Sequence, residues 1–190
     1  MSDLNPTQLS NVGYTHRVVE VLIALGSNMG DSLANLQEAT KRLGDYFEVV
    51  AESHIYETAP MYVTDQPVFL NAALLVKTSV GPREILARLK QLEQEIGRQV
   101  RQVCGPREID LDLIAYGSAI YRFVEGKTLK LEVPHPRVGE RRFVLQPLAD
   151  VAPEFNLPGI GSVSTLLMQT ELQANSVTKV DHALLSIPSH

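Results

Sequence analysis

Two aspartates separated by a single residue are the most informative chemical feature of this 190-residue sequence. They are Asp110 and Asp112, in the segment GPREIDLDLI at 105–114. If this segment is a β-strand, its aliphatic residues fill a core while the two carboxylates stand together on the other face, roughly 7 Å apart. Such a pair suits Mg²⁺, which takes one or two carboxylates together with phosphate oxygens. The alternative is an exposed strand face with solvated acids, and the two aspartates alone do not decide between these interpretations.

Basic residues accompany this pair and favour the first interpretation. Arg107 precedes Asp110 by three positions. The others are Arg98, Arg101, His135, Arg141 and Arg142. Residues 98–142 hold nine Lys and Arg against six Asp and Glu, although the whole chain has a net charge of −5. Guanidinium groups bind phosphate with two parallel hydrogen bonds. Metal carboxylates flanked by arginines therefore indicate phosphoryl-type transfer.

Composition and the absence of certain motifs exclude several classes of protein. The sequence has no GxxxxGK[ST] and no protein-kinase loop set, which excludes those two kinds of ATP site. Cys104 is the single cysteine, so no internal disulfide can form, and we expect it to be a loop thiol rather than a nucleophile. We expect a cytoplasmic protein, because there is no signal-peptide pattern and no apolar run of about 20 residues. The negative net charge argues against a nucleic-acid binder.

Hydrophobic periodicity, together with glycine, proline and capping residues, predicts the helices and strands that position these residues. The expected elements are a strand at 17–25, a helix from Asp31 or Ser32 to Gly44, strands within 47–58 and 68–78, a helix at 82–96, a strand at 109–116 and a hairpin through Gly117 and Gly126. The loop at 59–67 between two strands resembles a lid or binding loop. This order favours an α+β sandwich, a mainly antiparallel sheet with helices on one face, over a doubly wound fold. We expect a single domain at 16–171, a loosely attached N-terminal extension at 1–15 and a C-terminal tail at 172–190.

Taken together, several segments resemble one family, the 6-hydroxymethyl-7,8-dihydropterin pyrophosphokinases of folate biosynthesis. The resemblance covers roughly 18–157. The segments are ALGSNMGD at 24–31, YETAP at 56–60, DQPVFLNAA at 65–73, LEQEIGR at 92–98, GPREIDLDLI at 105–114, VPHPR at 133–137 and RRFVLQPL at 141–148. The resemblance implies a ferredoxin-like α+β sandwich. It also implies transfer of pyrophosphate from ATP to the hydroxymethyl group of a reduced pterin, with release of AMP and with two Mg²⁺ ions.

The resemblance also implies roles for individual residues. Asp110 and Asp112 would hold the metal. The ATP contacts would be Glu93, Arg98, Arg107, His135 and Arg141, and the pterin contacts would be Thr58, Ala59, Met61, Phe69, Asn71 and Phe143. Elementary chemistry supports part of this assignment, because Phe69 and Asn71 share a strand face and a flat heterocycle calls for a stacking ring beside a side-chain amide.

The loop at 99–104 departs from the family pattern. Cys104 stands where many members have Trp, and Ala59 stands where Pro is frequent. We expect this loop to close over bound ATP, with Arg101 supplying a catalytic positive charge.

Three functional hypotheses stay open at this point. The first is an active pyrophosphokinase with small-molecule substrates, acting as a monomer or weak dimer. The second is a catalytically weak paralogue that binds a pterin or a nucleotide. The third is another Mg²⁺-dependent phosphoryl-transfer enzyme acting on a different alcohol.

Overall fold

The computed structural model describes residues 17–61, 65–99 and 105–184. Its centre is a six-stranded sheet with the order β10-β3-β4-β1-β5, in which β2 also pairs with β4, and every pairing is antiparallel. The strands are β1 (Val19–Ser27), β2 (Glu48–Glu52), β3 (Ile55–Thr58), β4 (Phe69–Thr78), β5 (Asp110–Tyr116), β6 (Tyr121–Glu125), β7 (Thr128–Val133), β8 (Asn156–Leu157), β9 (Gly161–Ser162) and β10 (Val177–Val180). The helices are α1 (Ser32–Gly44), α2 (Pro82–Ile96), η1 (Val138–Glu140), α3 (Arg142–Val151), α4 (Val163–Gln169) and η2 (Glu171–Ser176).

Local signals in the sequence account for the first two helices. Asp31 caps α1, since its side chain accepts a hydrogen bond of 3.0 Å from the backbone N–H of Ala34. Pro82 begins α2, and Gly97 ends it with a φ of 111°, a left-handed conformation that favours glycine. The predicted helices at 32–44 and 82–96 are confirmed, as are the strands around them and the hairpin.

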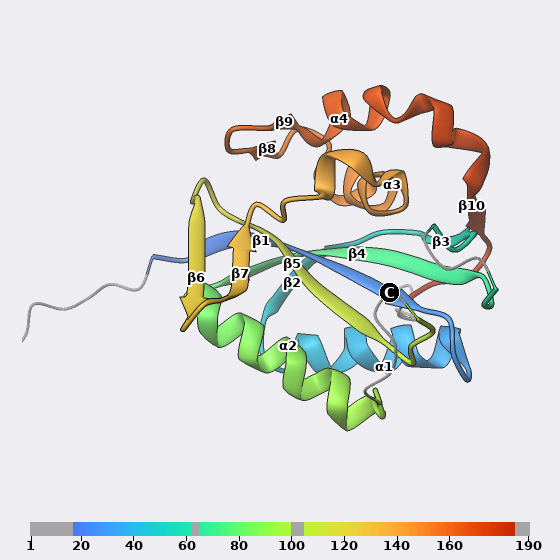
Figure 1. Ribbon diagram of the computed structural model, residues 1–190, viewed down its shortest axis with the longest axis horizontal. Helices are drawn as coiled ribbons and strands as arrows, with labels where there is room; N and C mark the ends of the chain where they lie inside the picture. Colours follow the sequence, from blue (N-terminus) through green and yellow to red (C-terminus); the bar gives the residue numbers. More distant parts are fainter. Residues whose placement is uncertain (1–16, 62–64, 100–104, 185–190) are drawn as a thin grey trace, which may run out of the picture.

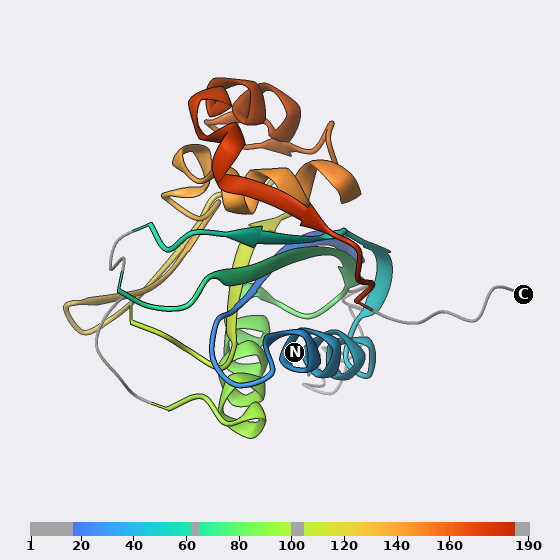
Figure 2. The ribbon, with the colours of Figure 1, turned by 90° about the vertical axis from the view of Figure 1, so that its right-hand side faces the viewer.

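The prediction that helices cover one face of the sheet is wrong. Figures 1 and 2 show three layers, with α1 and α2 on one side of the sheet and α3 and α4 on the other. Both faces of β1 are apolar: Val21 and Ile23 pack toward the first pair of helices, while Leu22 belongs to the core beneath α3. A sheet that is apolar on both faces must be covered on both, so the segment after 137 supplies a second helical layer.

The expected C-terminal tail at 172–190 also needs correction over its first part. Strand β10 pairs with β3, extending the sheet beyond the predicted domain boundary. Leu184 is 2% exposed and belongs to the core on the side of α1 and α2. Among the side chains of 172–184 whose burial the structure describes, only Leu184 is buried, which leaves little side-chain pattern, yet backbone pairing needs none.

Several predictions fall on residues that the structure does not describe. The N-terminal extension at 1–15, the residues Arg101 and Cys104 of the expected lid, and residues 185–190 all lie outside the described ranges. The predicted N-terminal extension therefore stays a prediction. Within the described ranges, no helix is both long and apolar enough to cross a membrane.

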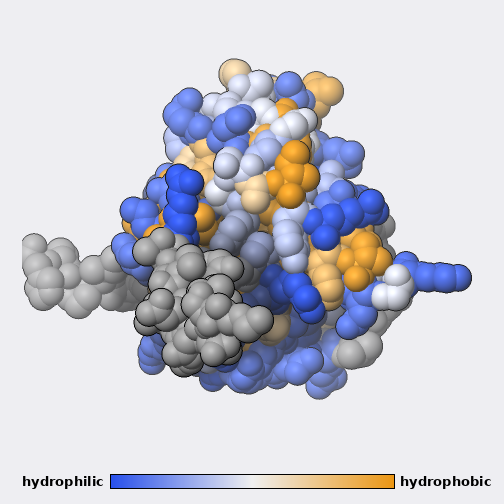
Figure 3. Space-filling model, turned by 90° about the vertical axis from the view of Figure 1, so that its left-hand side faces the viewer, coloured by the Kyte–Doolittle hydropathy of each residue, from blue (hydrophilic) through white to orange (hydrophobic). Residues whose placement is uncertain are grey.

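The hairpin β6–β7 projects from one side of the sheet, and Figure 3 views the molecule from that side. Ile120, Val124 and Leu129 are exposed in this region, whereas the ring of Phe123 is covered by Arg83, whose Cζ lies 4.0 Å from the ring centroid. Figure 3 shows apolar surface in separate groups divided by polar side chains. Over the described residues of this side, the apolar surface is thus divided rather than continuous.

Candidate active site

A cavity opens between the sheet and the N-terminal end of α3. It is lined by Ala24, Leu25, Gly26, Thr58, Ala59, Met61, Gln66, Phe69, Asn71, Ala72, Arg107, Asp110, Asp112, Arg141, Phe143 and Val144. Strand register creates the space, because Gly26 of β1 pairs with Asn71 of β4 on one side and with Asp110 of β5 on the other. Residues opposite each other in neighbouring strands share a face. Gly26 has no side chain, so a gap is left between an amide and a carboxylate.

Asp110 and Asp112 lie together on this cavity, while Ile109, Leu111 and Leu113 are buried in the core on the other side. The predicted alternation is confirmed. Burial alone would raise the pKa of Asp110, but the charges of Arg107 and Arg98 outweigh it and lower this pKa below its ordinary value. Burial and the neighbouring charge of Asp110 raise the pKa of Asp112. The second carboxylate therefore sits in a place where an added cation would stabilise its charged form.

The donor set suits a magnesium ion that also binds phosphate. Among the described residues, no group of three or more His, Cys, Asp or Glu is arranged to hold a metal by itself. Two carboxylates beside arginines match Mg²⁺, which keeps several waters and completes its shell with phosphate oxygens. Asp110 and Asp112 are the residues that would hold it.

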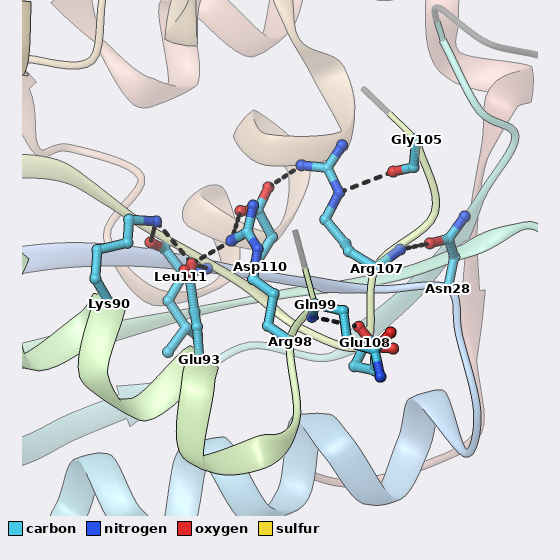
Figure 4. A network of polar contacts seen from close by, with 10 residues as sticks. All are labelled: Asn28, Lys90, Glu93, Arg98, Gln99, Gly105, Arg107, Glu108, Asp110 and Leu111. Atoms are coloured by element: carbon cyan, nitrogen blue, oxygen red, sulfur yellow. Dashed lines mark hydrogen bonds and ion pairs between the residues drawn. The ribbon is translucent and has the colours of Figure 1, made fainter. Parts of the chain in front are cut away.

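Two arginines form ion pairs with the carboxylate of Asp110. Arg98 places Nη1 2.6 Å from Oδ1 of Asp110, and Arg107 places Nη1 2.5 Å from Oδ2 (Figure 4). The guanidinium of Arg107 also lies beside the ring of Phe69, with 5.8 Å between Cζ and the ring centroid. The arginines expected to bind phosphate and the carboxylates expected to hold the metal therefore form one cluster.

His135 is attached to the same strand through its backbone. Its N–H donates to the carbonyl of Ile114 at 2.9 Å, and the N–H of Arg137 donates to its Nδ1 at 3.2 Å. Burial lowers the pKa of His135 despite the nearby charge of Asp112. A neutral His135 with Nδ1 acting as acceptor carries its proton on Nε2, where it can donate to a phosphate oxygen.

Two aromatic rings and an amide make the other part of the cavity. Phe69 and Asn71 face it from β4, and Phe143 faces it from α3. The amide of Asn71 donates to Oγ1 of Thr58 at 2.7 Å, and Asn71 is 6% exposed. Arg141 lies beside Phe143, with 5.7 Å between Cζ and the ring centroid. All six residues predicted to contact a pterin line this one cavity.

Glu93, like Arg98 and His135, is a predicted ATP contact that is not among the residues lining the cavity, whereas Arg107 and Arg141 are. Its carboxylate is 3% exposed and lies under β5, not among the residues that line the cavity. It accepts hydrogen bonds from Lys90 and from the backbone N–H of Leu111, and it forms an ion pair with Arg98. Burial raises the pKa of Glu93, with Lys90 the largest opposing influence. Its direct contact with ATP stays a prediction.

The sequence did not assign roles to three residues that the structure places in or near the site. Gly26 and Gln66 line the cavity, and Asn28 joins the loops around it. Gly26 and Asn28 stand in the ALGSN segment, and Gln66 in DQPVFLNAA, both already quoted as marks of a family. Strand pairing shows what Gly26 lies against, and hydrogen bonds between loops show what Asn28 and Gln66 contact.

Comparison with known proteins identifies the family. The model for 7,8-dihydro-6-hydroxymethylpterin-pyrophosphokinase (HPPK) matches residues 22–153. The chain belongs to the HPPK family. The match includes every candidate site residue described above, from Gly26 to Val144, and it confirms the resemblance stated from the sequence motifs.

Curated HPPK relatives are of two sizes. A folate synthesis bifunctional protein of Pisum sativum is 47% identical over 133 residues, which is 70% of this chain but 25% of that protein. The chain therefore spans about a quarter of the length of that relative. The 2-amino-4-hydroxy-6-hydroxymethyldihydropteridine pyrophosphokinase of Aquifex aeolicus is 38% identical over 133 residues, 70% of this chain and 80% of that protein. The enzyme of the same name from Bacillus subtilis is 43% identical over 131 residues, 68% of this chain and 75% of that protein.

Solved structures show the same fold. A crystal structure of Plasmodium falciparum HPPK-DHPS superposes with a TM-score of 0.68 at 14% sequence identity, covering 87% of this chain and 44% of that one. At this identity the likeness concerns the fold alone. It confirms the α+β ferredoxin-like sandwich expected for an HPPK.

Proposed function

We propose that this protein transfers pyrophosphate from ATP to the hydroxymethyl group of 6-hydroxymethyl-7,8-dihydropterin and releases AMP. In this reaction the hydroxymethyl oxygen forms a bond to the β-phosphorus of ATP. The bond between that phosphorus and the oxygen bridging to the α-phosphate breaks, so AMP leaves with the bridging oxygen. Much of the catalytic work in such a transfer is positioning and neutralisation of charge.

The chemistry divides between two halves of one cavity. Phe69, Phe143 and Asn71 would hold the pterin, with the rings against its faces and the amide at its edge. Asp110 and Asp112 would hold Mg²⁺, which would neutralise phosphate charge. The arginines Arg98, Arg107 and Arg141 and the neutral His135 would orient the phosphates by donating hydrogen bonds to their oxygens.

The observation that carries this proposal is the shared lining of the cavity. Asn71 and Asp110 flank Gly26 in adjacent strands, so a ring held by Asn71 would lie next to the carboxylate pair. A phosphoryl-transfer enzyme for another alcohol needs the carboxylates and arginines but has no use for a fixed amide and two aromatic rings in the same cavity. The pterin is thus the acceptor that fits best.

A nucleotide-release assay tests the proposal. The protein is incubated with Mg²⁺ and ATP, with and without 6-hydroxymethyl-7,8-dihydropterin, and AMP is measured. AMP that forms only with the pterin supports the proposal. Tight pterin binding without AMP formation would favour a ligand-binding paralogue, and ATP consumption that needs a different alcohol would favour another transferase.

Three further expectations concern the number of metal ions, the cellular location and the oligomeric state. We infer two Mg²⁺ ions for each ATP, countable from the Mg²⁺ dependence of AMP formation. A cytoplasmic location and a monomeric or weakly dimeric state also stay predictions. The name of the Pisum sativum relative says that it is mitochondrial.

A further inference from the structure

Leu111 lies between the two candidate metal ligands on the last strand of the main sheet. Strand β5 ends the strand order, and its ladder partner among the described residues is β1. In an antiparallel pair, every other residue turns its N–H and C=O away from the partner strand. Leu111 turns both toward α2: its N–H donates to Oε1 of Glu93 at 2.7 Å, and its C=O accepts from Nζ of Lys90 at 3.1 Å.

Lys90 and Glu93 thus bind the two backbone groups of one strand residue, Leu111. They lie three positions apart on α2 and on the same side of it, and Nζ of Lys90 also donates to Oε1 of Glu93 at 2.7 Å (Figure 4). Together one ammonium and one carboxylate provide the donor and the acceptor that a neighbouring strand would otherwise provide at this place. An edge residue that would be free to shift is thereby fixed.

The carboxylate of Glu93 also contacts Arg98, one of the arginines proposed to bind phosphate. Nη1 of Arg98 lies 2.6 Å from Oε1 of Glu93 and 2.6 Å from Oδ1 of Asp110. A carboxylate that is 3% exposed is costly unless its charge is balanced, and Lys90 and Arg98 share that task. Loss of Lys90 would leave Arg98 as the cation paired with Glu93 among the described residues and would draw that guanidinium away from Asp110.

We propose that Lys90 is a positioning residue for the metal strand. By holding the carbonyl of Leu111 and the carboxylate of Glu93, it fixes the separation of Asp110 and Asp112 and the direction of Arg98. Lys90 is not among the residues that line the cavity, so it would act through Leu111, Glu93 and Arg98. The proposal deepens the proposed function and rests on it, since the metal that the strand would hold belongs to that reaction.

Two variants and one matched control test the role of Lys90. Lys90→Met keeps the aliphatic stem and removes the ammonium, and Lys90→Arg restores a donor and a positive charge. Lys41→Met removes an exposed lysine of α1 and serves as the control. Residues that orient metal ligands typically change metal affinity about 10- to 100-fold when they are lost.

Steady-state measurements give the first readout. For Lys90→Met we expect the Mg²⁺ concentration for half-maximal AMP formation to rise by about 10-fold or more, while KM for the pterin changes by less than about twofold because the pterin residues lie on other elements. Lys90→Arg should recover most of the loss, and Lys41→Met should match the wild type. An unchanged Mg²⁺ requirement in Lys90→Met, or no recovery in Lys90→Arg, would overturn the proposal.

Amide exchange of Leu111, followed by NMR, gives a second readout that does not need turnover. The exchange should accelerate in Lys90→Met and stay at the wild-type rate in Lys41→Met. A wild-type protein that forms no AMP would refute the proposed function. The exchange rate of the Leu111 amide would still show whether Lys90 and Glu93 hold this residue in place. Equal exchange rates of Leu111 in Lys90→Met and wild type would show that Lys90 does not hold the strand.

Discussion

Asn28 and Arg107, 79 positions apart in the chain, are joined by two hydrogen bonds that hold the entrance of β5 against the end of β1. The N–H of Arg107 donates to Oδ1 of Asn28 at 2.8 Å, and the N–H of Asn28 donates to the carbonyl of Arg107 at 3.1 Å. The amide of Asn28 also donates to Oε1 of Gln66 and to the carbonyl of Pro67, at 3.1 Å each. A side chain that is 2% exposed thus links the loop before Phe69 to the loop that carries Arg107.

Asn28→Ala should therefore weaken both halves of the site together. The change leaves buried backbone groups without partners, so we expect the free energy of unfolding to fall by about 2–4 kcal/mol. KM should rise for ATP and for the pterin alike. Urea denaturation and steady-state kinetics measure the two effects. Asn156→Ala, at an exposed asparagine of β8, is the matched control, and a loss confined to one substrate would contradict the linking role.

Asp112→Asn should abolish turnover without weakening the fold. Burial and the charge of Asp110 raise the pKa of Asp112, which means that its charged form is disfavoured in the protein. Neutralising it should raise the free energy of unfolding at pH 7. Turnover should fall by at least about 100-fold, because a carboxylate ligand of the metal is lost. Asp45→Asn, at an exposed position after α1, should change neither quantity; a lower stability of Asp112→Asn would contradict the assignment.

Asn71→Ala tests recognition of the pterin edge. Removing a buried partner of the heterocycle should weaken pterin binding by about 1–3 kcal/mol. ATP affinity should barely change, since the amide donates its hydrogen bond to Thr58 and belongs to the set of residues proposed to hold the pterin. Calorimetry with each ligand separates the outcomes. Similar losses for both ligands would mean that Asn71 supports the fold instead of reading the pterin.

Gly26→Ala should also weaken pterin binding, because it displaces the amide of Asn71. A Cβ at this position would lie 3.1 Å from Oδ1 of Asn71, closer than the two atoms pack comfortably. The amide must then move from its place, so pterin affinity should fall by about tenfold or more. The fold should survive, because Gly26 is not among the glycines with positive φ. Gly81→Ala, where a Cβ meets nothing within 4 Å, is the control, and equal pterin affinity in both variants would refute the argument.

The raised pKa of Tyr56 leads us to expect that the free energy of unfolding falls at alkaline pH. Burial, aided by hydrogen bonds to Asp150, raises the pKa of Tyr56 to about 12. Below pH 10 the folded and unfolded chains both keep this proton. As the pH rises from 10 to 12, the unfolded chain releases it first, so stability falls by up to about 2–3 kcal/mol over that window.

Urea denaturation between pH 8 and 12 measures this loss. Tyr56→Phe should lack the alkaline step, while Tyr46→Phe, at a half-exposed tyrosine, should keep it. The same pH profile in wild type and Tyr56→Phe would show that Tyr56 titrates at its ordinary pKa.

The sequence by itself determined the local elements and the chemistry of the site. The alternation around Asp110 and Asp112 predicted which side chains are buried, because a strand has only two faces. The caps at Asp31 and Gly97 located helix ends, since unpaired backbone groups there need particular residues. The motifs that carry the family resemblance supplied the candidate ligands for the metal, the phosphates and the pterin.

The tertiary structure alone decided how these pieces meet. Helix α3 escaped prediction, and Pro147 in its interior argues against a helix when the sequence is considered alone. Strand β10 depends on backbone hydrogen bonds to β3, which leave little trace in side-chain pattern. Strand register and contacts between distant segments determine three features of the site. These are the space beside Gly26, the hydrogen bonds of Asn28 and the contact of Lys90 with Leu111. Local sequence does not encode such contacts, because they form only when distant segments pack together.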